Sequence, residues 1–235
     1  MKRAFTCLLL PLLCAACASF HDPDSDRLRG AMEITVTPAK MGENPPEVSY
    51  SAEVIMSRAE GYFGEKQFAE AAQEYGRFME LHATHEWAPY ALYQQGVSLM
   101  LQVKTADREP ALNRQALQAF DNLIVNYPQS AAVDDATRRR DQVRERLAEH
   151  ELGVARFYLR TDRAQSALSR LDYLMQNYPG TAIAGAAWFE MGQALAATGD
   201  AAGAANAYRR FLEGNPDPKR AAKAHKALAG LETGG

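Results

Sequence analysis

The stretch "GAAWFEMGQALAATGDAAGAANAYRRFLEGNP", residues 185–216, decides the fold. It contains two segments with helical periodicity, separated by "TGD" at 198–200. The pattern predicts two antiparallel helices, with Asp200 capping the second because its carboxylate can accept from free backbone N–H groups. Gly192 and Ala204 are small, which lets the helices cross closely, and Pro216 ends the second helix.

The pattern of this second helix occurs four times along the chain. Each copy has alanine, then large apolar residues four and seven positions later, then a helix-ending position after twelve. The four sets are Ala71, Tyr75, Phe78 and Ala83; Ala116, Phe120, Leu123 and Pro128; Ala167, Leu171, Leu174 and Pro179; Ala204, Tyr208, Phe211 and Pro216. These offsets define one helix face, and residues 188–216 fit the tetratricopeptide frame. The sequence therefore predicts an all-α tetratricopeptide-repeat solenoid of about four helix pairs.

The spacing between the copies departs from that of an ideal repeat. The helix-ending positions are 45, 51 and 37 residues apart, whereas an ideal repeat has about 34. "VKTADREPALNRQA" at 103–116 is predicted to lengthen one connection, and residues 133–161 are predicted to form an unusually long helix. Its start carries Asp134 and Asp135, which suit a helix N-terminus. "DPKRAAKAHKALAGLE" at 217–232 is predicted to be a C-terminal capping helix over the last repeat.

The first residues, "MKRAFTCLLLPLLCAACAS" at 1–19, form a leader. Lys2 and Arg3 precede an apolar run of ten residues, much shorter than the roughly 20 residues that a membrane-spanning helix needs. Residues 1–16 are therefore predicted to be a signal peptide. Cys17 follows two alanines, which resembles the lipobox of bacterial lipoproteins and predicts lipidation of Cys17. A simple A-x-A-like cleavage site is the alternative.

The cysteine count and the residue after Cys17 add a predicted location. All three cysteines lie in the leader, so the mature chain has no disulfide framework. In the lipoproteins that the leader resembles, an aspartate after the cysteine retains the protein at the inner membrane. Here that residue is Ala18, which favours a lipid-anchored protein of the outer membrane, facing the periplasm.

Residues 17–50 contain several acids and four prolines and show no helical periodicity. They are predicted to be a flexible tether from the lipidated cysteine. A coil of this length spans on the order of 30 Å. Residues 51–235 are predicted to be the repeat domain.

Composition and motifs disfavour several other classes of function. The chain has 26 Lys and Arg against 29 Asp and Glu, which gives no support to nucleic-acid binding. His82 and His85 lack the H-E-x-x-H order, so no metal or other cofactor is predicted. Arg138–Arg140 would either bind an acidic partner or form a solvated helix face, and the nearby aspartates favour the solvated face. No catalytic constellation stands out, which favours a non-enzymatic scaffold over a cell-wall-processing enzyme.

Taken together, the chain resembles the BamD family, the lipoprotein subunits of the outer-membrane β-barrel assembly machine. The resemblance covers roughly residues 52–216 and includes the leader with its cysteine. It rests on the irregular repeat spacing and on three segments: "LHATHEWAPYALYQQG" (81–96), "ADREPALNRQALQAFDNLIVNYPQS" (106–130) and "DATRRRDQVRERLAEHELGVARFYLR" (135–160). The family usually has five helix pairs where this chain has room for four, and the absent first pair is implicated in binding substrate C-termini.

The resemblance implies a scaffold that docks onto the POTRA domains of the barrel-forming subunit and contacts other assembly lipoproteins and unfolded outer-membrane proteins. An arginine used in docking matches Arg170 in "SRLDYLMQNYP"; a solvated arginine beside Asp172 is the alternative. Tyr90, Tyr93 and Trp188 are further candidate anchors, chosen by residue type. A lipoprotein that coordinates peptidoglycan synthesis or pilus secretin assembly is the alternative function.

Overall fold

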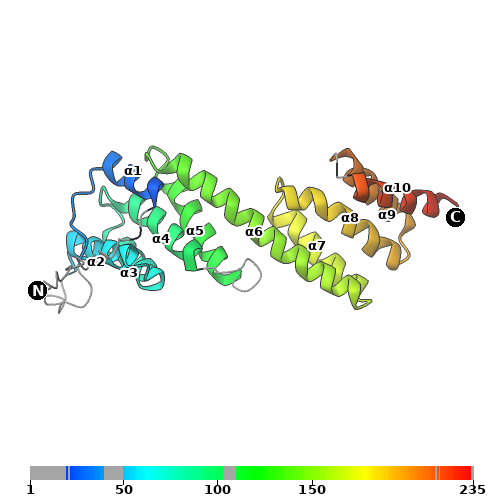
Figure 1. Ribbon diagram of the computed structural model, residues 1–235, viewed down its shortest axis with the longest axis horizontal. Coiled ribbons are helices and arrows are strands. Elements are labelled where there is room, and N and C mark those ends of the chain that lie inside the picture. Colours follow the sequence, from blue (N-terminus) through cyan, green and yellow to red (C-terminus); the bar gives the residue numbers. More distant parts are fainter. Residues whose placement is uncertain are drawn as a thin grey trace, which may run out of the picture.

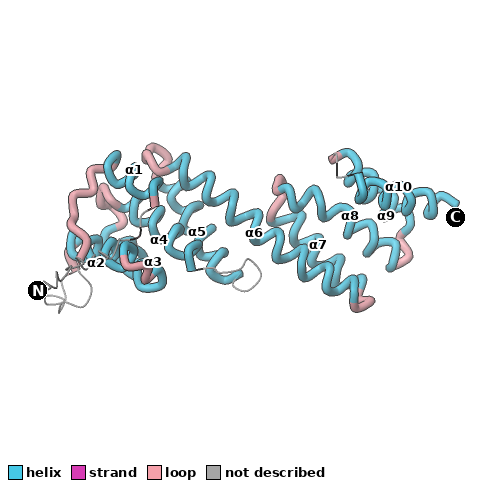
Figure 2. Tube along the Cα trace, in the orientation of Figure 1, coloured by secondary structure: helices cyan, strands magenta, loops and turns pink. Residues whose placement is uncertain are grey.

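The computed structural model describes residue 20 and residues 22–39, 50–102, 110–214, 216 and 218–233. Within these residues the chain forms ten helices and no strand (Figure 2), which confirms the predicted all-α class. The helices are α1 (Pro23–Ala31), α2 (Ala52–Gly64), α3 (Phe68–His82), α4 (Ala88–Gln102), α5 (Pro110–Asn126), α6 (Val133–Arg160), α7 (Ala164–Asn177), α8 (Ala182–Ala197), α9 (Ala201–Glu213) and α10 (Pro218–Thr233).

Eight of these helices form four pairs that stack into an elongated row (Figure 1). The pairs are α2 with α3, α4 with α5, α6 with α7, and α8 with α9. Helix α10 packs on α9 at the end of the row. The four-pair solenoid with a C-terminal cap is therefore confirmed.

The repeated alanine and apolar positions supply the core of every pair. All twelve are at most 4% exposed. They are Ala71, Tyr75 and Phe78 on α3, Ala116, Phe120 and Leu123 on α5, Ala167, Leu171 and Leu174 on α7, and Ala204, Tyr208 and Phe211 on α9. The sequence signature thus marks the face that each second helix turns toward its neighbours.

Two glycines show how closely the paired helices cross. A Cβ atom at Gly192 would lie 2.7 Å from the ring of Tyr208, and one at Gly96 would lie 2.6 Å from the ring of Phe120. Both distances are well inside van der Waals contact, so each ring occupies the space that a side chain would need. The predicted turn is also confirmed: Gly199 has φ +89°, and Asp200 accepts from the backbone N–H of Gly203 at 2.8 Å.

Helix α6 joins the two halves of the molecule. It is 28 residues long, and it packs on α5 before it packs on α7 and α8 (Figure 1). The apolar residues that α6 buries against its neighbours include Val143, Leu147, Leu152 and Ala155. The predicted long helix is confirmed, whereas the insertion at 103–109 lies outside the described residues.

The predicted flexible tether is wrong for its described part. Phe20 and residues 22–39, here called the strap, lie against the repeats, and α1 forms within them. Leu28 is 0% exposed and Ile34 is 6% exposed. This helix could not be predicted from the sequence because only Ser25 and Leu28 of α1 are buried, which is too few to produce a periodic apolar pattern.

No helix in the described part of the chain combines the length and apolar character needed to cross a bilayer. Cys17 and residues 40–49 lie outside the described residues, so the lipidation site and the remainder of the tether stay predictions.

Replacing Gly192 by alanine should destabilise the repeats, because the added methyl group would collide with Tyr208. Overpacking of this kind costs about 1–3 kcal/mol in unfolding free energy. Gly153→Ala is the matched control: this glycine lies in α6 with open space where its Cβ would be. That change should stabilise by about 0.5–1 kcal/mol. Urea unfolding checks both values, and equal effects of the two substitutions would contradict the close crossing.

Candidate protein-binding surfaces

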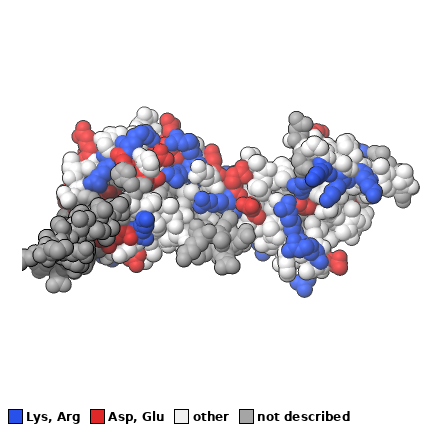
Figure 3. All heavy atoms as spheres, viewed as in Figure 1, with Lys and Arg blue, Asp and Glu red and all other residues white. Residues whose placement is uncertain are grey.

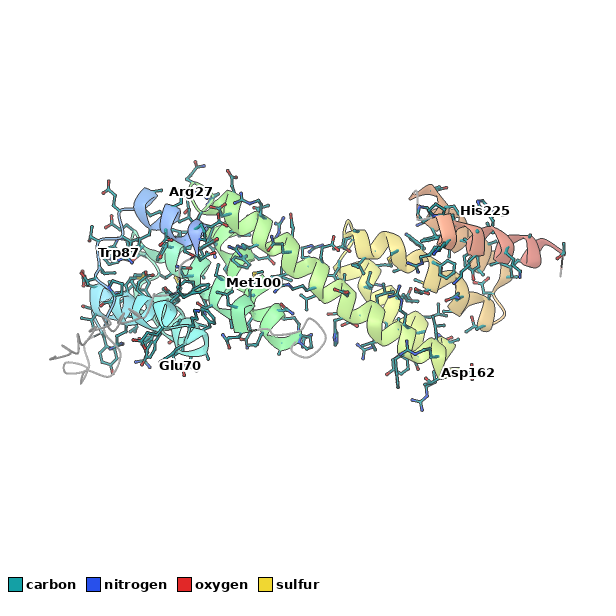
Figure 4. The ribbon with its side chains drawn as sticks, in the orientation of Figure 1. Arg27, Glu70, Trp87, Met100, Asp162 and His225 are labelled. Atoms are coloured by element: carbon teal, nitrogen blue, oxygen red, sulfur yellow. The ribbon has the colours of Figure 1, made fainter. Side chains whose placement is uncertain are left out.

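The strap lies across the first helices of three successive pairs. Arg29 pairs with Glu60 of α2 at 2.9 Å, and the Ser25 hydroxyl donates to Gln94 of α4 at 2.8 Å. Arg27 pairs with Asp135 of α6, and Figure 4 shows Arg27 near the start of that helix. This face of α2, α4 and α6 is therefore already occupied by the chain itself.

Glu60 is the polar centre beneath the strap. Its carboxylate accepts from the hydroxyls of Tyr75 at 2.7 Å and Tyr90 at 2.9 Å, in addition to its pair with Arg29. Burial raises the pKa of Glu60, while hydrogen bonding from Tyr75 and the charge of Arg29 oppose the shift. Removing any one of the three partners of this buried carboxylate would cost free energy of folding. The strap and the first repeat therefore stabilise each other.

The basic run at the start of α6 holds the strap. Arg139 pairs with Asp22 at 3.1 Å and with Asp24 at 3.2 Å, and Arg138 pairs with the buried Asp135. The interpretation of this run as a solvated face is therefore wrong for Arg139, since acidic residues of the same chain cover it. Arg140 pairs with Asp141 on α6.

Tyr90 and Tyr93 are wrong as candidate anchors. Tyr90 is 1% exposed and Tyr93 is 0% exposed, so neither can reach a partner. Both belong to α4, which is packed between its neighbouring helices and the strap, and Tyr90 donates its hydroxyl to Glu60. Residue type alone could not separate an aromatic core residue from an aromatic anchor.

Arg170 lies on α7 with its side chain 47% exposed. Its guanidinium is 3.4 Å from the carboxylate of Glu151, which is buried on α6. A buried carboxylate thus contacts the guanidinium of an arginine whose side chain is about half exposed. The partner is Glu151 on the adjacent helix, where the sequence suggested Asp172.

Trp188 is largely buried on α8, where the main core meets the smaller cluster under α10. The guanidinium of Arg210 on α9 lies 4.7 Å from the centre of its ring. The tryptophan is therefore part of the packing between repeats and offers only part of its ring to a partner.

On the face that Figure 3 shows, Lys and Arg side chains predominate over α7–α10. Arg156 and Arg220 both pair with the buried Glu190 at 2.8 Å, which ties α6, α8 and α10 together. The Arg220 guanidinium also lies 5.0 Å from the ring of Phe189. Over α1 and the start of α6, by contrast, charges of both signs interleave, as the ion pairs of the strap require.

A second surface is the open groove between α3, α4 and α5, with a volume of about 1370 Å³. Carboxamides dominate its polar lining: Gln73, Gln95, Gln102, Gln115, Gln118, Asn122 and Asn126. Arg77 and Glu80 are its charged residues, and their charges balance. Apolar side chains such as Leu99 and Met79 complete the wall.

This groove was not predicted, although the sequence of α5 carries a signal for it. Gln115, Gln118, Asn122 and Asn126 follow one another at steps of three and four residues, which places their amides on one helix face. Each carboxamide offers both a donor and an acceptor, as does each peptide group of an extended chain. The groove is therefore suited to backbone contacts.

The two histidines of "HATHE" belong to the packing at the end of α3. His82 hydrogen-bonds the carbonyl of Tyr50 at 2.6 Å, and the His85 ring stacks edge-on against Trp87 at 4.8 Å. Among the described residues, no group of three or more His, Cys, Asp or Glu side chains could hold a metal ion.

The raised pKa of Glu60 predicts a pH dependence of stability. The native chain holds the Glu60 proton more tightly than the unfolded chain does, so this residue contributes stability that is present below its ordinary value of 4.5 and lost as pH rises through the native value. We expect the difference in unfolding free energy between the unchanged protein and Glu60→Gln to decrease as pH rises above 4.5. Urea unfolding at a series of pH values measures it, and a pH-independent difference would contradict the raised pKa.

The comparisons with known proteins agree with this architecture. Residues 39–210 match the family YfiO, described as "Outer membrane lipoprotein". An outer membrane protein assembly factor BamD of Vibrio cholerae is 32% identical over 149 residues, which is 59% of this chain and 62% of that protein. The BamD of Caulobacter vibrioides is 26% identical over 154 residues, covering 66% of this chain and 50% of its own length.

The BamD of Neisseria meningitidis serogroup B is 28% identical over 146 residues, covering 58% of this chain and 55% of the relative. The chain thus spans between 50% and 62% of the length of these three relatives. Because the family match covers most of the repeat solenoid, the chain belongs to the YfiO family of outer membrane lipoproteins.

Proposed function

We propose that this protein is a non-enzymatic outer-membrane lipoprotein that acts as a scaffold in β-barrel assembly. It is anchored through Cys17, faces the periplasm and docks onto the POTRA domains of the barrel-forming subunit. The family match over residues 39–210 carries this proposal, because the relatives that share these repeats are named as outer membrane protein assembly factors. A row of helix pairs offers long, preformed surfaces to partner proteins, which suits a scaffold.

The C-terminal half supports the docking part of the proposal. There the repeats keep Arg170 half exposed and oriented by the buried Glu151. An arginine held in this way loses little side-chain freedom on binding, and arginine is enriched among the residues that dominate interface energies. The Lys and Arg side chains on the visible face of this half would suit an acidic surface on the partner (Figure 3).

Arg170→Glu should weaken co-purification of this protein with the barrel-forming subunit from detergent-solubilised outer membranes. A residue of this kind contributes at least about 1 kcal/mol to binding, so roughly fivefold or greater weakening is expected. Arg163→Glu is the matched control, since Arg163 is exposed at the start of the same helix.

One further variant and one unfolding measurement separate docking from folding. Glu151→Gln removes the carboxylate behind Arg170 and keeps the arginine, so co-purification should weaken less than it does in Arg170→Glu. Thermal unfolding of Arg170→Glu checks that the new glutamate beside Glu151 leaves the repeats folded. Unchanged co-purification of a folded Arg170→Glu variant would contradict its role in docking.

The amide-lined groove supports a second part of the proposal, the reception of unfolded outer-membrane proteins. Its carboxamides can pair with the peptide N–H and C=O groups of an extended segment whatever its side chains. The balanced charge of Arg77 and Glu80 adds no strong preference for acidic or basic sequences. Such a site suits a scaffold that must accept many different unfolded chains.

The double substitution Gln118→Ala and Asn122→Ala tests the groove, because both amides are exposed on the same face of α5. Each lost hydrogen bond is worth about 0.5–1.5 kcal/mol, so binding of a fluorescent segment of an unfolded outer-membrane protein should weaken about tenfold. Gln193→Ala with Asn206→Ala removes two exposed amides from the other half and serves as the control. Equal binding by both double variants would contradict this use of the groove.

A further inference from the structure

The strap begins only a few residues after Cys17, the residue proposed to carry the lipid. Phe20 is its first described residue, and its backbone N–H donates to the carbonyl of Gly64 at 2.6 Å. Its ring packs edge-on against Phe63 at 5.4 Å and Phe68 at 5.2 Å. The chain therefore meets the repeats at the turn between α2 and α3.

Cys17 precedes Phe20 by three residues. Three residues reach at most about 11 Å even when fully extended. A chain that was flexible over all of 17–50 would instead let the repeats wander on the order of 30 Å from the anchor. The docked strap thus removes most of the freedom that a tether of this length would give.

We propose that the strap acts as a rigid mount, which holds the α2–α3 turn against the phospholipid surface of the membrane. This inference rests on the lipidation of Cys17 in the proposed function. The opposite end of the solenoid, with α9 and α10, is then carried away from the anchoring point (Figure 1). The half that bears Arg170 lies toward that end, so the mount fixes the position of the docking surface relative to the membrane.

The contacts of the strap are numerous enough to keep it docked. Ion pairs join it to α2 and to α6 at both ends of α1, through Arg29, Arg27 and Asp22. Leu28 is fully buried. Beyond α1, the Ser57 hydroxyl of α2 donates to the Thr37 carbonyl at 2.6 Å. The strap is thus attached along its length, from Phe20 to Ala39, whose N–H donates to the Ser57 carbonyl at 2.9 Å.

The experiment uses the full chain, purified from membranes and reconstituted into vesicles of phosphatidylethanolamine and phosphatidylglycerol that carry an energy-transfer acceptor on some headgroups. A single fluorophore is attached at the exposed Gln67→Cys, in the α2–α3 turn, or at His225→Cys, in α10 at the far end (Figure 4). Labelling is specific because Cys7 and Cys14 leave with the signal peptide, and the lipid occupies the sulfur of Cys17. The fluorophore at position 67 should be quenched strongly, and the one at position 225 weakly.

Two insertions of ten Gly and Ser residues then distinguish a mount from a loose tether. An insertion between Ser19 and Phe20 lengthens the chain ahead of the strap by roughly 17 Å, so quenching at position 67 should decrease. The same insertion between Gly42 and Glu43 follows the strap and should leave quenching unchanged. Leu28→Asp, which places a charge at a buried position, should release the strap and lower quenching without any insertion.

Equal loss of quenching from the two insertions, or no loss from the first, would overturn the rigid mount. Mass spectrometry of the purified chain gives the independent control. If Cys17 carries no acyl group, the lipid anchor of the proposed function fails, and this inference fails with it. If Cys17 is acylated and the two insertions behave alike, the anchor stands and only the mount is overturned.

Discussion

The close crossing of the two helices in each pair is the constraint on which the rest of the structure depends. Alanine at the crossing, or glycine facing a ring as in Gly96 and Gly192, lets the backbones approach until the larger side chains fill the space beside them. Each pair then exposes an apolar face that only the next pair, or α10, can cover. The result is a row of helices with extended surfaces, which is an architecture for binding proteins.

This dependence explains which features the sequence could predict. The small residues and the apolar positions four and seven residues later recur at fixed offsets. The four pairs and the core of their second helices could therefore be predicted from the sequence. The long helix α6 could be predicted as well, because it increases the spacing between repeats. The docking of the strap could not be predicted, because ion pairs such as those of Arg139 with Asp22 and Asp24 leave no periodic apolar pattern in the sequence of α1.

The wrong prediction of Tyr90 and Tyr93 as binding anchors also follows from the close packing of the helices. Helix α4 is surrounded by α3, α5 and the strap, and twelve of its fifteen residues are buried. Tyr90 and Tyr93 belong to this buried surface, so their aromatic character serves packing and the Glu60 network. The strap covers one face of α4, while Gln95 and Leu99 open onto the amide-lined groove on another. Arg170, identified by resemblance, is the candidate that the fold leaves half exposed.

The central claim, that this solenoid is a scaffold for β-barrel assembly, is tested most directly by its partners in the native membrane. The measurement is affinity purification of the full-length protein from detergent-solubilised outer membranes, followed by mass spectrometry of the proteins that accompany it. The account predicts recovery of the POTRA-containing, barrel-forming subunit. Recovery of a secretin or a peptidoglycan synthase in the absence of that subunit would contradict it.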